Sequence, residues 1–584
     1  MANILGLNAY HGDASVALVK DGILVAAIEE ERLNRLKHCA GFPVMSVRAA
    51  LAQAGIGPED IDYVGVSRDP RANLHKKILF AVRRPGFAGQ VRDRLVNLGK
   101  IRSIRETLAD ALGVRLLRAE VHSVGHHRSH VASAFYVSPF EEAACLSIDG
   151  FGDFVSTMRA MGRDRDIQLI DEIGFPHSAG VFYTAITQYL GFLKYGEEWK
   201  LMGLAPYGKP VHVAKLRQLI APRPEGRFEL DLSYFLHALS GVEMTWADGI
   251  PSVGTLYSPR LTELLGPPRD PHSTDYYVKW ADIAASAQVV YEEILFHVLQ
   301  DLWHRTRVPR LALAGGCALN SVANGKIQEK TPFREIFIQP AAADDGTAVG
   351  AAFHVQHALL REPRRFVMES AYTGPAYDDR VVERAIERAR RIGWDPAIDV
   401  RRFEDDLLFR EVAGAVSAGK VVGWFQGAME FGPRALGNRS IVADPRRADM
   451  KDILNQRIKH RETYRPFAPS VLEERVGDYF ERAEPAPFML TVYRVRAEQR
   501  ERIPAVTHVD GTGRLQTVSR RQNPRYHALI SEFERQTGVG VGLALNTSFN
   551  EHEPIVASPE DALACYLKTR MDVLALGNWV LVRR

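Results

Sequence analysis

The sequence predicts an α/β protein with a duplicated N-terminal domain followed by a second α/β domain. Two observations carry this prediction: a strand–turn–strand pattern occurs twice in the N-terminal third, and glycine-rich turns follow several buried strands. The length agrees with this prediction, because a chain of 584 residues is longer than a single domain with one hydrophobic core usually is. A content of 46% hydrophobic and 25% charged residues is typical of a globular protein in water.

The first copy of the pattern lies at the N-terminus. Residues 4–7, 14–19 and 24–28 are expected as strands, joined by the polar turn HGD and by a tight Asp21-Gly22 hairpin. The segment that starts at Ala143 repeats this scheme, with AACLSID, the turn GFGD, FVSTMRAM, a polar turn and IQLIDEI. We interpret the two copies as an internal duplication whose turns direct backbone N–H groups toward a phosphate.

A third element of the same kind follows. In RLALAGGCALN a buried strand enters Gly315-Gly316 and a helix is expected near Asn320; IFIQP and DDGTAVGAAF then give a strand and a small-residue helix. Duplicated units of this kind are the pattern of the actin and acetate-kinase type of ATPase fold. An unrelated α/β domain with ordinary glycine turns stays open at this point.

The pattern changes after residue 360, where REPRRF and TGPAYDD indicate a linker. We therefore expect domains at 1–360 and 361–584. In the second domain, residues 405–418 predict a helix, 421–425 a buried strand, GAMEFGPRALGNRS a long loop and 543–546 a short strand.

Four side chains form a candidate metal site. His126 and His130 in GHHRSH are four residues apart and share one helix face, while Asp149 and Asp344 stand at glycine turns after strands. Imidazole and carboxylate groups could together hold one metal ion beside a nucleotide phosphate. The competing interpretation is that the histidines are only a surface or capping pair.

Arginines and lysines form a second candidate site. The loop GPRALGNRS carries Arg434 and Arg439; further cations stand downstream at Lys459, Arg461, Arg465, Arg514 and Arg525. Guanidinium forks match phosphate oxygens in pairs, so this density suits a polyanion such as a triphosphate. The alternative is that these arginines form surface ion pairs with Glu430, Asp444 and Glu462.

Charge and cysteine content exclude several other classes. A net charge of +3 gives no basis for nucleic-acid or membrane attraction, and we interpret the basic stretch from Lys76 to Arg105 as a solvated helical face. The four cysteines form no CxxC pair, so neither a zinc ribbon nor a disulfide framework is expected. No signal peptide and no run of eighteen apolar residues is present, which predicts a cytoplasmic protein.

Nine motifs give the chain a family resemblance. The sequence resembles the O-carbamoyltransferases of the nodulation-factor and antibiotic-tailoring type through LGLNAYHGDASVALVKDG, EEERLNRLKH, GHHRSHVASAFY, KLMGLAPYG, LAGGCALN, AADDGTAVGAA, GPRALGNRS, YRPFAPS and NTSFNEHEPI. The resemblance implies two active sites. A YrdC-like C-terminal domain would make carbamoyl-adenylate from carbamoyl phosphate and ATP with Mg²⁺, and an actin-like N-terminal domain would pass the carbamoyl group to a hydroxyl of a small molecule or glycan.

The same resemblance assigns residues to these sites. It implies that His126, His130, Asp149 and Asp344 hold a divalent metal, Fe²⁺ in relatives, and that Lys37, Gly315, Gly316 and Asn320 contact the adenylate. Carbamoyl phosphate and ATP would be bound by Arg434, Lys459, Arg465, Arg514 and Asn546. Cys39 departs from the family pattern, because many relatives have a polar residue there.

The acceptor hydroxyl must lose its proton during attack, and His11 and Asp13 on the first glycine turn are the nearest candidate bases by motif. His11 could instead only cap its turn. With Lys37 they complete the expected catalytic set.

Rival functions share these domain types. Hydrogenase maturation proteins carry an acylphosphatase domain and CxxC zinc motifs, which this chain lacks. Threonylcarbamoyl transfer to tRNA fits the near-neutral charge poorly, and an actin-like ATP-dependent binding module is a third possibility. The acceptor cannot be identified from the sequence, and a homodimer is the default expectation for the assembly.

Overall fold

The computed structural model describes residues 2–69, 72–73, 104–242, 244–246, 249–394, 397–482, 484–550 and 553–584. The basic stretch from Lys76 to Arg105 falls almost wholly outside these residues. The chain divides into two compact units. The N-terminal unit contains Met1–Asn320 and Lys326–Met368, and the C-terminal unit contains Ser321–Gly325 and Glu369–Arg584. In the part of the chain that the structure describes, no helix combines the length and the apolar character that a membrane span needs.

Two five-stranded sheets with the same topology form the centre of the N-terminal unit. Their orders are β3-β2-β1-β4-β5 and, read in the matching direction, β8-β7-β6-β13-β14. In each sheet three consecutive strands pair antiparallel and two later strands add parallel neighbours. The predicted duplication is therefore confirmed by the strand order and direction. The strands are β1 (Asn3–Asn8), β2 (Ser15–Lys20), β3 (Ile23–Glu29), β4 (Tyr63–Val66), β5 (Glu120–Ser123), β6 (Glu142–Gly152), β7 (Val155–Arg163), β8 (Asp166–Gly174), β13 (Arg310–Ala314) and β14 (Glu335–Ile338).

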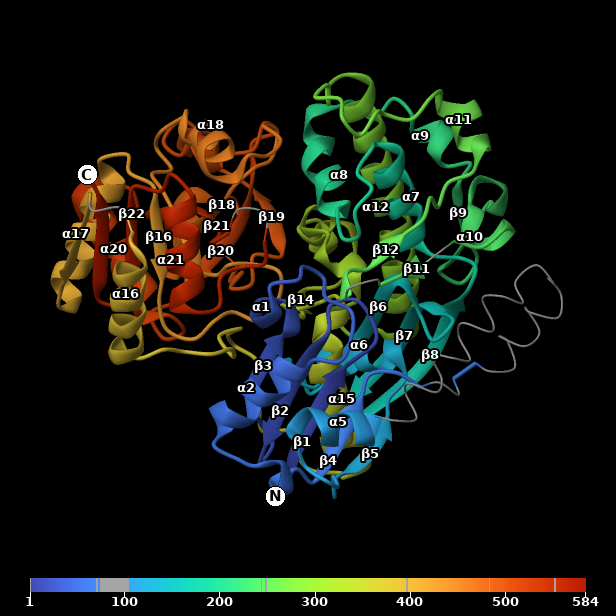
Figure 1. Cartoon of the computed structure of the whole chain (residues 1–584). Helices are drawn as coiled ribbons and strands as arrows, with labels where there is room; N and C mark the ends of the chain where they lie inside the picture. The colour runs from blue at the N-terminus through green and yellow to red at the C-terminus, as the bar shows by residue number, and fades with distance from the viewer. Residues whose placement is uncertain are drawn as a thin grey trace. The chain divides into compact units, whose positions relative to one another are not determined.

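Two helices lie between these sheets. Helix α15 (Thr347–His354) packs on β1, β2 and β4, helix α6 (His126–Phe135) packs on β6, β7 and β13, and the two helices pack on each other (Figure 1). Both helices are buried along almost their whole length, which explains the small residues in TAVGAAF and SHVASAF. This central helix pair brings the start of α6 close to the segment that precedes α15.

The remaining elements of the N-terminal unit surround this centre. They are α1 (Glu30–Asn34), α2 (Val44–Ala54), η1 (Pro58–Asp60), α5 (Ile104–Leu112), α7 (Ala179–Tyr189), α8 (Glu198–Leu204), η3 (Ala205–Tyr207), α9 (Val213–Leu216), β9 (Ile220–Arg223), β10 (Arg227–Leu230), η4 (Leu232–Tyr234), α10 (Leu236–Leu239), β11 (Met244–Thr245), β12 (Ser252–Val253), α11 (Pro259–Leu265), α12 (Lys279–Thr306), η6 (Gly316–Leu319), α14 (Ile327–Lys330), η7 (Asp344–Gly346) and η8 (Val355–Leu359). Helix α12 is the longest of these, and its first half packs on α7, α8 and η3.

A mixed sheet with the order β15-β23-β22-β16-β17-β21-β18-β20-β19 forms the C-terminal unit. Its strands are β15 (Ile398–Arg402), β16 (Val422–Phe425), β17 (Arg439–Val442), β18 (Ala468–Leu472), β19 (Thr491–Arg494), β20 (Thr512–Val518), β21 (Val541–Ser548), β22 (Val573–Leu576) and β23 (Trp579–Arg583). The helical elements are α13 (Ser321–Asn324), α16 (Asp379–Ile392), α17 (Asp405–Ser417), α18 (Met450–Leu454), η9 (Asn455–Lys459), η10 (Glu473–Arg475), α19 (Val476–Tyr479), η11 (Ala497–Gln499), η12 (Pro504–Val506), α20 (Pro524–Thr537) and α21 (Pro559–Lys568).

Alternating side chains give this sheet a core on each face. In β16, Val422 and Trp424 pack under α17 and α20, whereas Phe425 belongs to the core under α16 and α21. Because successive strand residues point to opposite faces, an almost continuous apolar run is needed where both faces are covered. The two-unit α/β fold class predicted from the sequence is therefore confirmed.

Two predicted elements of the C-terminal unit have different bounds. The loop expected over residues 427–440 ends earlier, because Arg439 and Ser440 begin the buried strand β17. A charged residue usually indicates a loop, but the Arg439 guanidinium donates to the carbonyls of Gln426 and Gly427 and is fully buried. The strand expected at 543–546 is longer in both directions, over Val541–Ser548.

Candidate functional site

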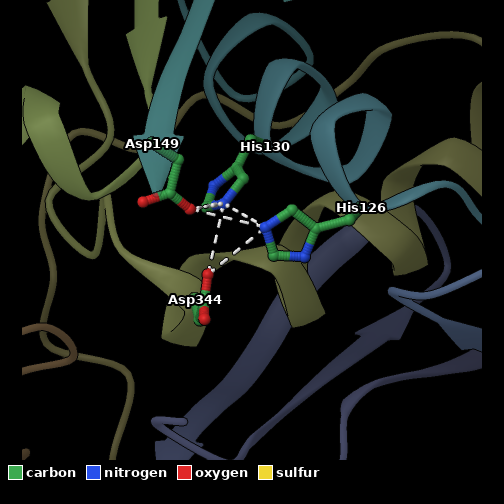
Figure 2. Close-up of side chains that lie close together, drawn as sticks. All are labelled: His126, His130, Asp149 and Asp344. Atoms are coloured by element: carbon green, nitrogen blue, oxygen red, sulfur yellow. Dashed lines mark hydrogen bonds and ion pairs between the residues drawn. The ribbon is translucent and has the colours of Figure 1, made fainter. Parts of the chain in front are cut away.

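Four predicted metal ligands converge in the N-terminal unit, as Figure 2 shows. His126, His130, Asp149 and Asp344 each offer one ligand atom, and these atoms all lie within 4.8 Å of one another. The Nε2 atom of His130 is 3.1 Å from Nε2 of His126 and 3.2 Å from Oδ2 of Asp149. Both Nε2 atoms are 3.4 Å from Oδ1 of Asp344. We call these four residues the metal set.

Different elements position the metal set. His126 and His130 are one turn apart at the start of α6, Asp149 stands in β6, and Asp344 begins the short helix η7 before α15. The Asp149 carboxylate also accepts a hydrogen bond of 3.2 Å from the backbone N–H of Gly316. Close packing of α6 on α15 brings the two histidines to Asp344 although more than 200 residues separate them in the sequence.

The electrostatics of the metal set favour a bound positive charge. Burial alone would lower the pKa of His130, but hydrogen bonds with Asp149 and Asp344 outweigh it and raise the pKa to about 9. Burial would raise the pKa of Asp149, yet hydrogen bonds with His126 and His130 hold it well below its usual range. The two carboxylates thus require a cation, either a proton on the imidazole or a metal ion.

The donor atoms fit a divalent transition metal. Two imidazole nitrogens and two carboxylate oxygens suit iron(II) and its neighbours better than the all-oxygen environment that magnesium or calcium prefers. The adjacent His127 has another role: its ring contacts Ser147 Oγ and the Val155 carbonyl, and burial lowers its pKa to about 3. The structure therefore separates the structural His127 from the two candidate ligands His126 and His130 in the motif GHHRSH.

The two predicted bases have different partners. Nδ1 of His11 pairs with Oδ2 of Asp344, so His11 contacts the metal set directly. Oδ1 of Asp13 instead lies 2.8 Å from Nδ1 of His38, a residue that the sequence did not single out. Lys37 is exposed on the turn before His38. Its contact with an adenylate stays a prediction.

The predicted adenylate-binding residues follow β13. Gly316 begins η6 beside Asp149, and Gly315 precedes it with a φ of 93°. The side chain of Asn320 is buried and exchanges two hydrogen bonds, of 3.0 and 3.1 Å, with Gln288 of α12. Tyr183 donates to the same Gln288. No sequence signal marked Gln288 or Tyr183, because both stand in helices whose polar residues look unremarkable locally.

Four arginines come together in the C-terminal unit. Arg434 stands in the loop before β17, Arg461 and Arg465 follow η9, and Arg514 lies in β20. Burial lowers the pKa of Arg514 well below its usual range, and the nearby positive charges of Arg434 and Arg465 add to this. The pKa of Arg461 is lowered in the same way by burial, Arg465 and Arg514. We call these four residues the arginine cluster.

Few anions offset the arginine cluster in the described ranges. Glu462 lies 3.7 Å from Arg465, while the Nε atoms of Arg434 and Arg514 are buried without a hydrogen-bond partner there. Half-buried guanidinium groups that repel one another are unfavourable unless an anion joins them. This cluster fits a phosphate-rich ligand.

Other predicted residues of this site have protein partners. The Lys459 ammonium is buried and donates to oxygens of Ser548 and Asn550, so a phosphate would have to compete with these bonds. Asn546 lies in β21, and its side chain is outside what the structure describes. The ion-pair alternative holds for Asp444, which pairs with Arg446, and for Glu462, which lies 3.7 Å from Arg465. Arg525 pairs with Asp405, a partner that the alternative did not include. Glu430 instead accepts backbone N–H groups of its own loop, including that of Leu436.

The chain is similar to known proteins over its whole length. Residues 3–353 match the family described as carbamoyltransferase N-terminus, and residues 413–583 match carbamoyltransferase C-terminus. An uncharacterized protein of Synechocystis, sll1178, is 40% identical over 100% of this chain and 97% of its own length. The nodulation protein NolNO of Sinorhizobium fredii is 37% identical over 99% of this chain and 80% of its own length.

Likeness to solved structures is low. The crystal structure of T. kodakarensis HypF has a TM-score of 0.31 and 13% identity, and it covers 60% of this chain and 47% of that one. At this level the likeness carries no argument about fold or function.

Proposed function

The chain belongs to the carbamoyltransferase family, and we propose that it is an ATP-dependent O-carbamoyltransferase with one half-reaction in each unit. In the C-terminal unit, water would split carbamoyl phosphate into carbamate and phosphate, and a carbamate oxygen would then attack the α-phosphate of ATP to give carbamoyl-adenylate and pyrophosphate. The N-terminal unit would pass the carbamoyl group to a hydroxyl of a small molecule or glycan and release AMP. The observation that carries this division is that the metal set and the arginine cluster lie in different units.

The arginine cluster supports adenylate formation in the C-terminal unit. Carbamoyl phosphate and the triphosphate of ATP, with Mg²⁺, would bring negative charge to a cluster in which buried guanidinium nitrogens of Arg434, Arg461 and Arg514 have no hydrogen-bond partner in the described ranges. Arginine pairs can hold phosphoryl oxygens in two places at once, which positions the reacting groups and offsets charge that develops during transfer. No nucleophilic side chain is needed for adenylate formation, because the carbamate released by hydrolysis of carbamoyl phosphate supplies the attacking oxygen.

The metal set supports transfer in the N-terminal unit. A divalent cation, which we propose is Fe²⁺, would supply Lewis-acid polarisation of the adenylate phosphate and so improve the leaving group. His126, His130, Asp149 and Asp344 would hold it, while Gly316 orients Asp149 through its N–H and His11 orients Asp344. Gln288 forms two hydrogen bonds with the amide of Asn320 and would so hold it in place for contact with the nucleotide.

The use of ATP has a physical reason. The carbamoyl group is small and offers few contacts, whereas an adenylate carries a nucleotide whose binding energy can position the reacting carbon. Conversion of carbamoyl phosphate to the adenylate therefore provides a large group that the transfer site can bind tightly before attack occurs.

Pyrophosphate release tests the first half-reaction. Purified protein with ATP and Mg²⁺ is expected to release pyrophosphate only when carbamoyl phosphate is added. The variant Arg514→Gln should lower this rate by about 30-fold or more, because it removes one partner of a charge-assisted contact. Arg494→Gln is the matched control, since Arg494 is exposed on the neighbouring strand β19. ATP hydrolysis at a rate independent of carbamoyl phosphate would favour an actin-like binding module. Retention of the protein on tRNA would favour threonylcarbamoyl transfer.

A further inference from the structure

Two turns of the N-terminal unit face each other beside the metal set. The first turn, residues 9–14, joins β1 to β2, and the second turn, residues 35–41, follows α1. Backbone hydrogen bonds connect them at both ends, from the Tyr10 N–H to the Gly41 carbonyl at 2.7 Å and from the Ala14 N–H to the Cys39 carbonyl at 2.8 Å. The facing of the two turns is therefore fixed by the main chain.

Asp13 and His38 are the side chains that meet between these turns. Nδ1 of His38 lies 2.8 Å from Oδ1 of Asp13, and the backbone N–H of His38 donates to Glu31 at 2.7 Å. Both residues have left-handed backbone conformations, with φ of 56° for Asp13 and 55° for His38. Residues other than glycine rarely adopt such angles unless the surroundings impose them, and they concentrate at functional sites.

The pair is connected to the metal set by the same turn. His11, two residues before Asp13, pairs with Asp344, and the Ser15 hydroxyl donates to the carbonyl of Asp345 at 2.7 Å. Tyr195 lies near both the Asp13–His38 pair and the metal set. Its ring packs edge-on against His38 at a centroid distance of 5.5 Å, and burial together with the nearby charges of Asp344, Asp13 and Asp149 raises the pKa of its hydroxyl.

The hydrogen bonds determine which nitrogen of His38 can act. A carboxylate only accepts hydrogen bonds. In the neutral imidazole of His38, Nδ1 therefore carries the hydrogen and donates it to the hydrogen bond with Asp13, while Nε2 keeps its lone pair. Nε2 has no hydrogen-bond partner in the part of the chain that the structure describes, and the side chain is 26% exposed. Glu31 is already engaged by the backbone N–H of His38 and by Arg32 at 3.5 Å.

We propose that Nε2 of His38 takes the proton from the acceptor hydroxyl during carbamoyl transfer, with Asp13 as the residue that positions the imidazole. The inference rests on the proposed function, which supplies carbamoyl-adenylate. As the hydroxyl oxygen bonds to the carbamoyl carbon, the bond from that carbon to the phosphate oxygen breaks and AMP leaves with the electron pair. The hydroxyl proton goes to Nε2, and the resulting imidazolium is stabilised by the Asp13 carboxylate, the logic of an aspartate–histidine pair.

Charged groups around His38 set the expected pH dependence. Burial would lower the pKa of His38, but Asp13 outweighs it and Glu31 adds to the increase, whereas Lys37 opposes it. Tyr195, in the segment before α8, and Glu198, the first residue of α8, also lie close to His38. Because the base must be unprotonated, transfer is expected to increase with pH through a value above 6.5. In Asp13→Asn the maximum rate of carbamoyl transfer should fall, and the increase of the rate with pH should occur at lower pH than in the wild type.

The decisive experiment compares two nucleophiles with the full-length, metal-loaded protein. Glycerol and methyl glucoside are alcohols that need a base, whereas hydroxylamine attacks at neutral pH without one. The variant His38→Gln is expected to lower carbamoyl transfer to the alcohols by about 100-fold or more while transfer to hydroxylamine stays within about threefold. His304→Gln, a change at an exposed histidine in the last turn of α12, is the matched control.

The other outcomes are separable. An equal fall with alcohols and hydroxylamine would overturn the proposal, because His38 would then hold the adenylate or the fold instead of a proton. Unchanged transfer to the alcohols would overturn it as well, and so would a wild-type protein that carbamoylates hydroxylamine but none of the alcohols. Absence of carbamoyl-phosphate-dependent pyrophosphate release in the wild type would instead refute the proposed function. Transfer to hydroxylamine close to the wild-type rate shows that the N-terminal unit of His38→Gln is folded, and an unchanged rate of pyrophosphate release shows the same for the C-terminal unit.

Discussion

His126 shows how closely the metal set depends on a neighbouring residue. Its imidazole packs against Gly152, where a Cβ atom would lie 1.9 Å from Cδ2 of the ring. Gly152→Ala must therefore displace His126, and we expect metal affinity at least about tenfold weaker, as for other changes to the groups that orient a ligand. Metal content after dialysis against a metal buffer measures this.

Gly150→Ala is the matched control for that experiment. Gly150 lies two residues away in the same strand, β6, and a Cβ there would have no neighbour within 4 Å. It should bind metal like the wild type. Equal loss of metal in both variants would indicate that the backbone at the end of β6, and not the packing of His126, determines metal affinity.

Single residues also show where sequence reasoning reaches its limit. The side chains of the metal set could be selected from the sequence because two histidines four apart share one helix face, two aspartates stand at glycine turns, and all four match the motifs of the family resemblance. The partners of His11 and Asp13 were not, since they depend on contacts with Asp344 and His38 that tertiary packing alone creates. Likewise the motif GPRALGNRS does not show that Arg439 donates to backbone carbonyls whereas the Nε atom of Arg434 has no hydrogen-bond partner in the described ranges.

At the scale of elements, the contact between α6 and α15 determines whether the metal set assembles. Gly350 of α15 lies so close to α6 that a Cβ would be 1.8 Å from the Ser129 carbonyl oxygen. Gly350→Ala should lower the free energy of unfolding by about 2 kcal/mol or more, because a backbone group cannot move aside easily. Urea denaturation measures this change.

A helix glycine without such a contact provides the comparison. In α17, a Cβ on Gly414 would meet only Oε1 of Gln536 at 3.8 Å. Gly414→Ala is therefore expected to stabilise the C-terminal unit by up to about 1 kcal/mol through helix propensity. Stabilisation by both substitutions would mean that the two central helices pack less closely than described.

The segment after α15 makes the protein sensitive to acid. His357 is 1% exposed, stacks on Phe353 at 5.5 Å and donates from Nδ1 to the Glu362 carbonyl at 2.9 Å. Burial lowers its pKa to about 4. The unfolded chain binds this proton near pH 6.5, so the contribution of His357 is complete above 6.5 and is lost as the pH falls toward 4.

His357→Asn keeps a donor for Glu362 but does not titrate. Between pH 7 and 5, the loss of unfolding free energy should be smaller in this variant by about 2 kcal/mol. Denaturation curves at the two pH values measure the difference. An unchanged loss would show that His357 already exchanges protons freely in the folded state.

Element prediction succeeded where the hydrophobic pattern was repeated. The two copies of the strand–turn–strand unit reinforce each other, and both sheets have the order they imply. The bounds of β17 were wrong because a buried arginine looks polar in sequence while its charge is satisfied by carbonyls. The role of α12 in holding Asn320 depends on residues 32 positions apart, which a local pattern cannot indicate.

At the scale of the whole molecule, the account assigns one half-reaction to each compact unit. The sequence predicted two domains from a change of pattern near residue 360, and the compact units part between Met368 and Glu369, with Ser321–Gly325 belonging to the C-terminal unit. Such an excursion of five residues cannot be recognised from composition. The division of chemistry follows from the location of the metal set and the arginine cluster.

The measurement that tests this division most directly is made on His130→Ala. Pyrophosphate release and carbamoyl transfer to hydroxylamine are followed in one reaction with ATP, Mg²⁺ and carbamoyl phosphate. Because His130 belongs to the metal set of the N-terminal unit, release should stay within about threefold of the wild type while transfer falls by about 100-fold or more. Asp344→Asn, which changes only the charge of another ligand, should behave the same way. An equal fall of both activities in the two variants would contradict the assignment of the half-reactions to separate units.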